Sequence, residues 1–271
     1  MCAMRWMTCI QYTIFYYLKV YKRTTIMNWH PDVQRVQSLH QIVQRTPEWY
    51  DAREGMLTAS DVASALGDNP YKSRQSLLVS KVEPPKEYAS SFATAHGNKY
   101  EDEARLLFGE VYGLETWEVG LFRHPEIGWI GGSPDGIASD GSLIEIKCPV
   151  KRKIEHKIPG YYYPQVQICM EVLDISMCYF IQYKPETTFG PAEMDVLKVW
   201  RSKEWFANAL PHLDSFWKDV TRYRANPETL VRRSYNRKAK EPTPEPSEKP
   251  PPRCLIVDDP EDYSDTETEH E

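Results

Sequence analysis

The sequence lacks the cysteine patterns of a disulfide-rich or zinc-binding protein. Its six cysteines form no Cys-x-x-Cys pair and show no spacing that is typical of metal ligands. Cys148, Cys169 and Cys178 lie within apolar stretches, a position typical of buried, reduced thiols. We therefore expect the protein to work in a reducing compartment such as the cytoplasm or the nucleus.

The sequence also lacks an apolar stretch long enough to cross a bilayer. The candidate stretch, Trp6–Val20, is interrupted by Gln11, Thr13 and Lys19 and is shorter than a membrane-spanning helix. It has no small-residue cleavage site, which argues against a secretory signal. We interpret residues 1–26 as an N-terminal extension or a misassigned start, and a membrane-surface anchor is the alternative.

The net charge of −6 is concentrated at the C-terminal end of the chain. Residues 258–271 contain eight acidic residues and no lysine or arginine, and removing these eight charges leaves +2 on residues 1–257. The overall charge therefore does not exclude a nucleic-acid partner. Residues 237–271 are rich in proline and then in acids, a composition that cannot build a core, so we expect a disordered tail.

A chain of 271 residues fits one folded domain with appendages, and we expect that domain at residues 27–236. Helical periodicity and capping residues predict helices at 31–45, 60–66, 73–82, 92–108, 164–173 and 195–224. Alternating and β-branched stretches predict strands at 118–124, 128–130, 142–147 and 177–183. This order of elements predicts an α/β or α+β fold.

The most informative segment runs from Asp135 to Lys147. A turn at Asp140-Gly141 folds Asp135 back towards Glu145, and the period of two in a strand puts Glu145 and Lys147 on one face. Burying two carboxylates beside an ammonium group is costly unless a cation or a substrate compensates their charge. Mg²⁺ is the natural candidate, because proteins bind it through one or two carboxylates together with phosphate and water.

These residues belong to a series of motifs. Ser133–Gly136 (SPDG) and Glu145–Pro149 (EIKCP) are preceded by Trp49–Ser60 (WYDAREGMLTAS) and followed by Tyr163–Gln167 (YPQVQ). In this order they resemble the phage lambda exonuclease and YqaJ-like viral recombinase branch of the PD-(D/E)XK nuclease superfamily, over about residues 45–185. The resemblance implies a central mixed sheet flanked by helices. It also implies a viral protein that works in the cytoplasm or nucleus of an infected cell.

The resemblance implies a Mg²⁺-dependent deoxyribonuclease, with Mn²⁺ as a substitute, that digests double-stranded DNA from its 5′ ends. The 3′ single strands left behind would serve recombination or repair, so a single-strand-annealing protein is the implied partner. Some relatives are ring-shaped trimers that enclose DNA, which implies a homo-oligomer. Two alternatives remain, namely an endonuclease or junction resolvase on the same core and a DNA-end-binding adaptor without catalysis.

The resemblance also implies a metal site. Asp135 and Glu145, with Glu101 from the long helix, would position one or two Mg²⁺ ions, and the backbone carbonyl of Ile146 would be a further ligand. Some relatives carry another acid on the strand before the SPDG motif. Glu126 lies near that position, although it is not in clean register.

Two more residues would act in the reaction. Lys147 would orient or help to deprotonate the attacking water and would stabilise charge on the phosphate. Gln165 would hold water or substrate, and Gln167, two residues later, is the alternative for the same role.

Arg53, Ser60 and Ser133 match the residues that grip a terminal 5′-phosphate in the lambda-type enzymes. An arginine offers a bidentate fork to phosphate, and Ser60 at a helix start adds donors where the helix dipole favours anions. For Arg53 the alternative is a surface ion pair with Asp51 or Glu54.

A basic segment, Lys151–Lys153, is followed by three tyrosines, Tyr161–Tyr163. Such a segment could follow a DNA backbone or stack on unpaired bases, and a solvated loop is the alternative.

Overall fold

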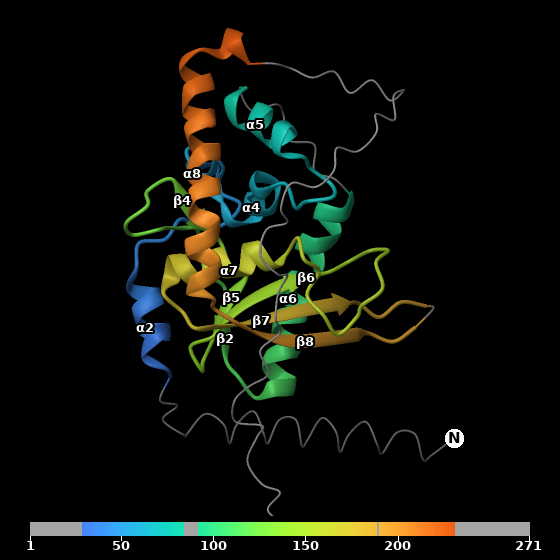
Figure 1. Ribbon diagram of the computed structural model, residues 1–271. Helices are drawn as coiled ribbons and strands as arrows, with labels where there is room; N and C mark the ends of the chain where they lie inside the picture. Colours follow the sequence, from blue (N-terminus) through green and yellow to red (C-terminus); the bar gives the residue numbers. More distant parts are fainter. Residues whose placement is uncertain (1–28, 84–91, 189, 231–271) are drawn as a thin grey trace, which may run out of the picture.

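The computed structural model describes residues 29–83, 92–188 and 190–230 (Figure 1). The predicted extension at 1–26, the predicted tail at 237–271 and both predicted limits of the domain lie outside the described residues. The described part is a mixed α/β fold with two sheets, which confirms the expected fold class. Within these ranges, no helix is long and apolar enough to cross a membrane.

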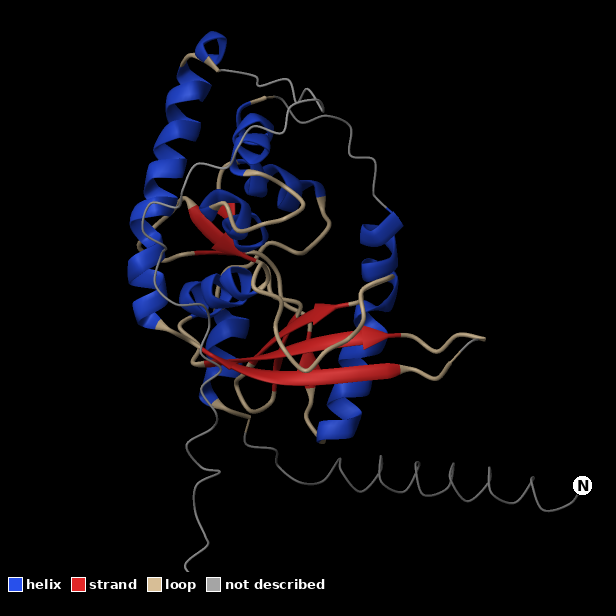
Figure 2. Cartoon of the chain, turned by 45° about the vertical axis from the view of Figure 1, so that its right-hand side comes forward, coloured by secondary structure: helices blue, strands red, loops and turns tan. Residues whose placement is uncertain are grey.

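The larger sheet is mixed, as the resemblance implies. Its strands are β2 (Thr116–Trp117), β5 (Gly136–Ala138), β6 (Leu143–Lys147), β7 (Met177–Lys184) and β8 (Glu193–Trp200). They lie in the order β2-β5-β6-β7-β8, and only the β6–β7 pair is parallel. The smaller sheet has the order β1-β4-β3 and consists of β1 (Leu57–Thr58), β4 (Ile130–Gly132) and β3 (Phe122–Arg123). Figure 2 shows the larger sheet in the lower half of the molecule.

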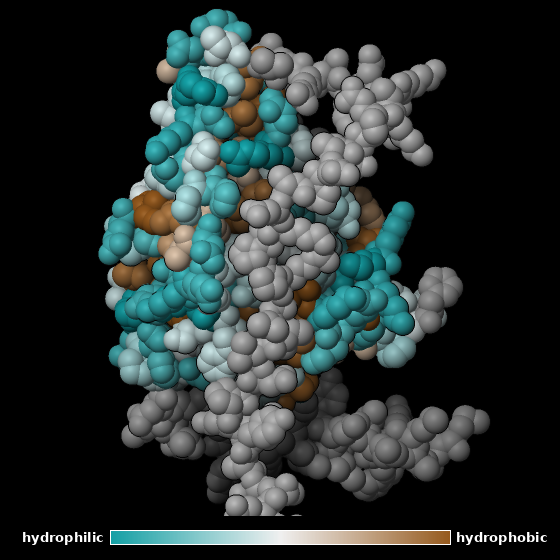
Figure 3. All heavy atoms as spheres, in the orientation of Figure 1, coloured by the Kyte–Doolittle hydropathy of each residue, from teal (hydrophilic) through white to brown (hydrophobic). Residues whose placement is uncertain are grey.

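Helices cover both faces of the larger sheet. The helices are α2 (Pro31–Ser38), α3 (Pro47–Glu54), α4 (Ala59–Leu66), α5 (Arg74–Val82), α6 (Phe92–Tyr112), α7 (Tyr163–Leu173) and α8 (Lys203–Ala225), with a short 3₁₀ turn at Pro227–Thr229. Helix α6 packs on one face and α7 on the other, and α4 and α8 pack against α7 (Figure 1). On the molecular face that Figure 3 shows, hydrophilic residues predominate and hydrophobic ones form small separate groups.

The alternation of residues along β6 assigns its two faces. Ile144 and Ile146 pack against α6, whereas Leu143 belongs to the core that contains α7. Glu145 and Lys147 have the parity of Leu143, so their side chains lie on the α7 side of the sheet. The expectation that Glu145 and Lys147 share a face is therefore confirmed.

The β5–β6 hairpin brings the two predicted carboxylates together. Its turn contains Gly141 at a φ of 88°, a conformation that side-chain-bearing residues rarely adopt. Gly136 lies opposite Ile144, and Asp135 N donates to Ile144 O at 3.0 Å, which puts Asp135 next to Glu145. A Cβ atom at Gly136 would lie 2.7 Å from a backbone oxygen of β2, so the glycine after Asp135 permits close approach of the neighbouring strand.

The prediction of one helix over residues 195–224 is wrong in its first part. Residues 193–200 form β8, which pairs with β7 over eight residues, and α8 begins only at Lys203. Leu197 and Val199 are buried while the residues between and after them are exposed, a period of two rather than 3.6. Ser202 marks the start of α8, because its hydroxyl oxygen accepts a hydrogen bond from Trp205 N and caps the helix.

Two further predictions are also wrong in part. The predicted helix at 31–45 ends at Ser38, and the predicted strand at 118–124 is shortened to β3 (Phe122–Arg123), while β2 ends before it at Trp117 and belongs to the other sheet. The reason is that the chain after Ser38 pairs with the chain before β3, where Ile42 and Leu121 form an isolated antiparallel bridge. The backbone hydrogen bonds of this bridge replace those of a longer helix and a longer strand.

Candidate active site

Glu145 is a buried acid whose two carboxylate oxygens have different surroundings. Its side chain is 2% exposed, and Lys147 Nζ and Gln165 Nε2 both donate to its Oε1. Oε2 has no hydrogen-bond partner among the described residues. Burial and the charge of Asp135 raise the pKa of Glu145 to about 8. A buried carboxylate oxygen without a partner is costly, so Oε2 is an atom that a bound cation would satisfy.

Asp135 lies beside Glu145 across the hairpin. Its Oδ2 accepts a hydrogen bond from Ile146 N at 2.6 Å. Burial raises the pKa of Asp135, and the charge of Lys147 together with this hydrogen bond opposes the rise. Two neighbouring acids with raised pKa values have too little positive charge around them, which is typical of carboxylates that bind a cation.

Lys147 is the cation that accompanies the two acids. Burial alone would lower its pKa, but the carboxylates of Glu145 and Asp135 raise it above the ordinary lysine value. Its Nζ also lies 5.1 Å from the ring centroid of Tyr162, within range of a cation–π contact. Lys147 is thus held as a protonated donor beside the carboxylates.

Glu101 interacts with Asp135 through its charge, and its hydrogen bond is with Arg45. Its Oε2 accepts from Arg45 NH2 at 2.7 Å, and its side chain is 16% exposed. Burial and the charge of Asp135 raise the pKa of Glu101 to about 7, while Arg45 opposes the rise. The sequence motifs do not single out Arg45, which has a φ of 66° although it is not glycine.

Two neighbouring carboxylates of the site have the chemistry to hold a divalent cation. In residues 29–83, 92–188 and 190–230, no three His, Cys, Asp or Glu side chains are grouped closely enough to hold a metal ion. Asp135 and Glu145, with the unpartnered Oε2, match the one or two carboxylates through which Mg²⁺ is commonly held. The roles of Glu101 and of the Ile146 carbonyl stay predictions.

The additional acid near Asp135 is different from the one considered in the sequence. Glu126 is exposed, and it does not contribute to the described shift of the Asp135 pKa. Glu118, which lies directly after β2, raises that pKa by its charge.

The two glutamines of α7 have different surroundings. Gln165 donates to Glu145 Oε1, as expected for a residue of the site. Gln167 is buried, donates to Trp200 O at 2.8 Å and accepts from Ser202 N at 2.7 Å. Gln167 thus forms hydrogen bonds with backbone groups between β8 and α8. The geometry favours Gln165, rather than Gln167, as the glutamine that acts beside Glu145.

The three residues predicted to bind phosphate are connected through an aromatic ring. Arg53 NH2 donates to Ser60 Oγ at 3.2 Å, and the Arg53 guanidinium lies 4.1 Å from the ring centroid of Trp49. Trp49 Nε1 in turn donates to Ser133 Oγ at 3.0 Å. The structure therefore connects Arg53, Ser60 and Ser133 through Trp49. Ser133 lies two residues before Asp135 in the sequence, which connects this cluster to the carboxylates.

A buried ion pair that the sequence analysis missed supports this cluster. Lys81 Nζ lies 2.9 Å from Asp61 Oδ2 and donates to the backbone oxygens of Arg53 and Met56 at 3.2 and 3.0 Å. Arg224 at the end of α8 donates to Glu54 O at 2.6 Å and to Lys81 O at 2.8 Å. Helices α5 and α8 thus fix the backbone that carries Arg53.

The basic segment Lys151–Lys153 does not act as one surface. Arg152 donates to Gln182 Oε1 at 2.6 Å and to Lys153 O at 3.3 Å, so its guanidinium is used within the fold. Lys151 and Lys153 are exposed. Of this segment, Lys151 and Lys153 are therefore the cations that face solvent and could contact a DNA backbone.

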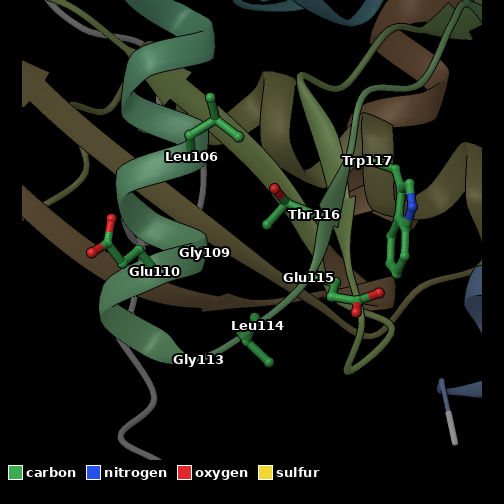
Figure 4. A pocket seen from close by; sticks show the side chains of 8 residues that line it. All are labelled: Leu106, Gly109, Glu110, Gly113, Leu114, Glu115, Thr116 and Trp117. Carbon is green, nitrogen blue, oxygen red and sulfur yellow. The ribbon is translucent and has the colours of Figure 1, made fainter. Parts of the chain in front are cut away.

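A hollow of about 430 Å³ lies elsewhere, between the C-terminal part of α6 and β2 (Figure 4). Its lining includes Leu106, Glu110, Thr116 and Trp117, and it contains none of the residues predicted for the site. The carboxylate cluster and this hollow are therefore separate features of the molecule.

Comparison with protein families identifies the region that holds the site. Residues 48–176 match the family model of the YqaJ-like viral recombinase domain. Among curated proteins, the uncharacterized protein R354 of Acanthamoeba polyphaga mimivirus is 28% identical over 184 residues, which are 61% of this chain and 34% of that protein. Protein D345L of African swine fever virus (isolate Tick/Malawi/Lil 20-1/1983) is 30% identical over 155 residues, 46% of this chain and 44% of its own length. The chain thus spans less than half the length of these relatives.

Solved structures agree with this match. The alkaline exonuclease LHK-Exo of Laribacter hongkongensis, in complex with dAMP, is 27% identical with a TM-score of 0.60, over 68% of this chain and 96% of the exonuclease. A phage related exonuclease from Haemophilus somnus shares the fold at 14% identity, with a TM-score of 0.51 over 63% of this chain and 95% of its own. The expected PD-(D/E)XK fold and viral relatives are confirmed. The motifs, the fold and the family match thus agree that residues 48–176 are similar to the YqaJ-like viral recombinase domain.

Proposed function

We propose that this protein is a Mg²⁺-dependent exonuclease that digests double-stranded DNA from its 5′ ends and leaves 3′ single strands for recombination or repair. The observation that carries the proposal is the buried Glu145, with one oxygen held by Lys147 and Gln165 and the other without a partner among the described residues. The family match and the likeness to an alkaline exonuclease support the nuclease class.

In this proposal each residue of the hairpin has a separate task. Asp135 and Glu145 would hold the metal, which when bound stabilises negative charge on the phosphate and eases deprotonation of water. Lys147 would keep a positive charge next to the phosphate as negative charge develops. Gln165 would fix the orientation of the Glu145 carboxylate, since it donates to Oε1.

The polarity of digestion is assigned to the cluster around Trp49. Arg53 would bind a terminal 5′-phosphate, and the hydroxyl groups of Ser60 and Ser133 would donate to the same anion. Ser60 lies in the first turn of α4, where unpaired backbone N–H groups favour an anion. An annealing-protein partner and a ring-shaped oligomer remain predictions of the family resemblance.

Digestion of three substrates tests the proposal directly. The full-length protein should degrade a linear duplex with 5′-phosphate faster than the same duplex with 5′-hydroxyl, and it should leave a covalently closed circle intact. Mg²⁺ or Mn²⁺ should support the reaction, and EDTA should stop it. Cleavage of the closed circle would instead identify an endonuclease, and binding of ends without any cleavage would identify an adaptor.

Arg53→Ala should remove most of the preference for 5′-phosphorylated ends. A charge-assisted bidentate contact to phosphate contributes about 1.5–3 kcal/mol, so the ratio of initial rates on the two linear substrates should fall roughly ten- to a hundredfold. Arg222→Ala is the matched control, because Arg222 is an exposed arginine that pairs with Asp219 on α8. If Arg53→Ala keeps the wild-type ratio, the assignment of the phosphate pocket is wrong.

Methionine substitutions should separate the tasks of Gln165 and Gln167. Gln167→Met leaves Ser202 N and the Trp200 carbonyl without a buried partner, so the free energy of unfolding should fall by about 1–3 kcal/mol. Gln165→Met should lower the digestion rate with a smaller loss of stability, because Gln165 is only partly buried. Chemical denaturation and rate measurements on both variants check this, and equal stability losses would contradict it.

A further inference from the structure

Three tyrosines form a continuous series of ring contacts between the surface and the candidate active site. Tyr71, in the connection between α4 and α5, is 79% exposed, and its ring centroid lies 5.4 Å from that of Tyr161. The Tyr161 centroid lies 4.4 Å from that of Tyr162. The ring of Tyr162 in turn lies 5.1 Å from Lys147 Nζ. We call Tyr71, Tyr161 and Tyr162 the tyrosine track.

The two ends of the tyrosine track differ in burial. Tyr162 is the fixed inner end, because its ring packs at 5.8 Å from Phe180 in the sheet. Tyr161 is partly buried, and burial together with a side-chain hydrogen bond to Tyr71 raises the pKa of its phenol. Tyr71 cannot be explained as core packing, since most of its ring is in contact with solvent. An apolar ring held on the surface by another ring is available to bind a flat apolar partner.

Cations accompany the tyrosine track at both ends. Lys72, next to Tyr71, lies 3.7 Å from Asp61, and Thr58 donates to Asp61 at 3.0 Å and contacts Ser60 at 3.2 Å. Lys72, at the outer end, is thus connected to Ser60 of the proposed 5′-phosphate site through Asp61 and Thr58. The inner end reaches Lys147. Aromatic rings interleaved with cations are the arrangement by which proteins bind single-stranded nucleic acids, with bases on the rings and phosphates on the cations.

We propose that the tyrosine track binds unpaired bases of the strand that is being digested, between the 5′-phosphate pocket and the carboxylates. The inference rests on the proposed nuclease function and assigns to it a subsite for single-stranded DNA. Tyr71 and Tyr161 meet at an interplanar angle of 89°, edge to face, so they do not stack in parallel on one another. The exposed ring of Tyr71 therefore has room for a stacked base.

The experiment follows the stacking of individual bases on the full-length protein. A 5′-phosphorylated oligonucleotide carries 2-aminopurine at its first, second or third position, and binding is measured in EDTA by fluorescence quenching and anisotropy. Stacking on an aromatic ring should quench the probe at one of these positions. Tyr71→Ala should remove that quenching and weaken binding about 5- to 100-fold, the range of alanine substitutions at base-stacking aromatics.

Two variants serve as controls. Tyr71→Phe should keep both the quenching and the affinity, because it preserves the ring. Tyr112→Ala is the matched control, since Tyr112 is another exposed tyrosine, 47% exposed, that packs on Phe108 of α6 away from the track. Tyr161→Leu is a second probe of the track, and thermal denaturation establishes that each variant is folded.

The outcomes distinguish this inference from the proposed function. If the wild type digests duplex ends but Tyr71→Ala and Tyr161→Leu bind and quench as the wild type does, the tyrosine track is not a base-binding subsite, whereas the nuclease function stands. If Tyr112→Ala weakens binding as much as Tyr71→Ala, the effect is not specific to the track and the inference fails. If the wild type neither binds nor digests DNA, both proposals fail.

Discussion

Glu145→Gln is expected to abolish digestion of duplex DNA while the protein stays folded and binds DNA ends. The substitution keeps the shape of the side chain and the acceptor oxygen for Gln165, and it removes the charge that would hold the metal. Loss of one element that stabilises charge in a transition state commonly costs about 10²–10³-fold in rate, and loss of the metal should cost at least as much. Asp135→Asn should behave in the same way, because Asp135 carries the second carboxylate.

The stability of the metal-free protein provides the control for this prediction. The pKa of Glu145 is raised from 4.5 to about 8, so the folded state favours the neutral acid. The contribution of Glu145 to stability should therefore decrease as the pH rises from about 4.5 to about 8. In EDTA at pH 8, Glu145→Gln should unfold at a temperature no lower than wild type. A large decrease in that temperature would mean that lost activity reflects unfolding, and near-normal activity with Mg²⁺ would refute the metal site.

Lys147→Met should lower turnover far more than it weakens binding of DNA. The aliphatic part of the side chain is kept, while the charge that is proposed to act on the phosphate in the transition state is lost. We expect kcat to fall by roughly 10²–10³-fold, with Kd changed only a few-fold. Single-turnover rates and binding in EDTA measure the two quantities separately.

Lys151→Met is the matched control for Lys147. Lys151 is an exposed lysine four residues further along the chain, and the loss of its charge should affect rate and binding weakly. Equal losses of affinity and turnover in Lys147→Met would indicate a plain phosphate contact. A loss of turnover in Lys151→Met of the same size would show that net charge, rather than the position of Lys147, controls the reaction.

The β5–β6 hairpin of the candidate site could be predicted from the sequence because its residues are close together along the chain. Asp135, Glu145 and Lys147 are connected by a glycine-containing turn and by the period of two in β6, so their proximity follows from strand geometry alone. Gln165 could be chosen by motif, and the structure adds the reason, since Gln167 is used by the backbone around Ser202.

Arg45, Lys81 and Arg224 could not be found from local pattern. Each acts through contacts with residues distant in sequence, such as the ion pair between Arg45 and Glu101. The same limit explains the error at residues 195–200. An apolar stretch with Val196, Leu197 and Trp200 suits a helix face as well as a strand, and only the neighbouring β7 decides between them.

The hydrogen bonds of Arg224 have a consequence for any shortened form of the protein. Every residue predicted for the site lies between Arg53 and Gln165, and the family match ends at residue 176. Arg224 nevertheless holds the backbone on both sides of the arginine pocket, through Glu54 and Lys81. A chain that stops before α8 would retain the whole set of motifs and lose the two hydrogen bonds by which Arg224 holds the backbone next to Arg53. In the proposed function, recognition of a DNA end would thus be specified by one part of the chain and supported by another.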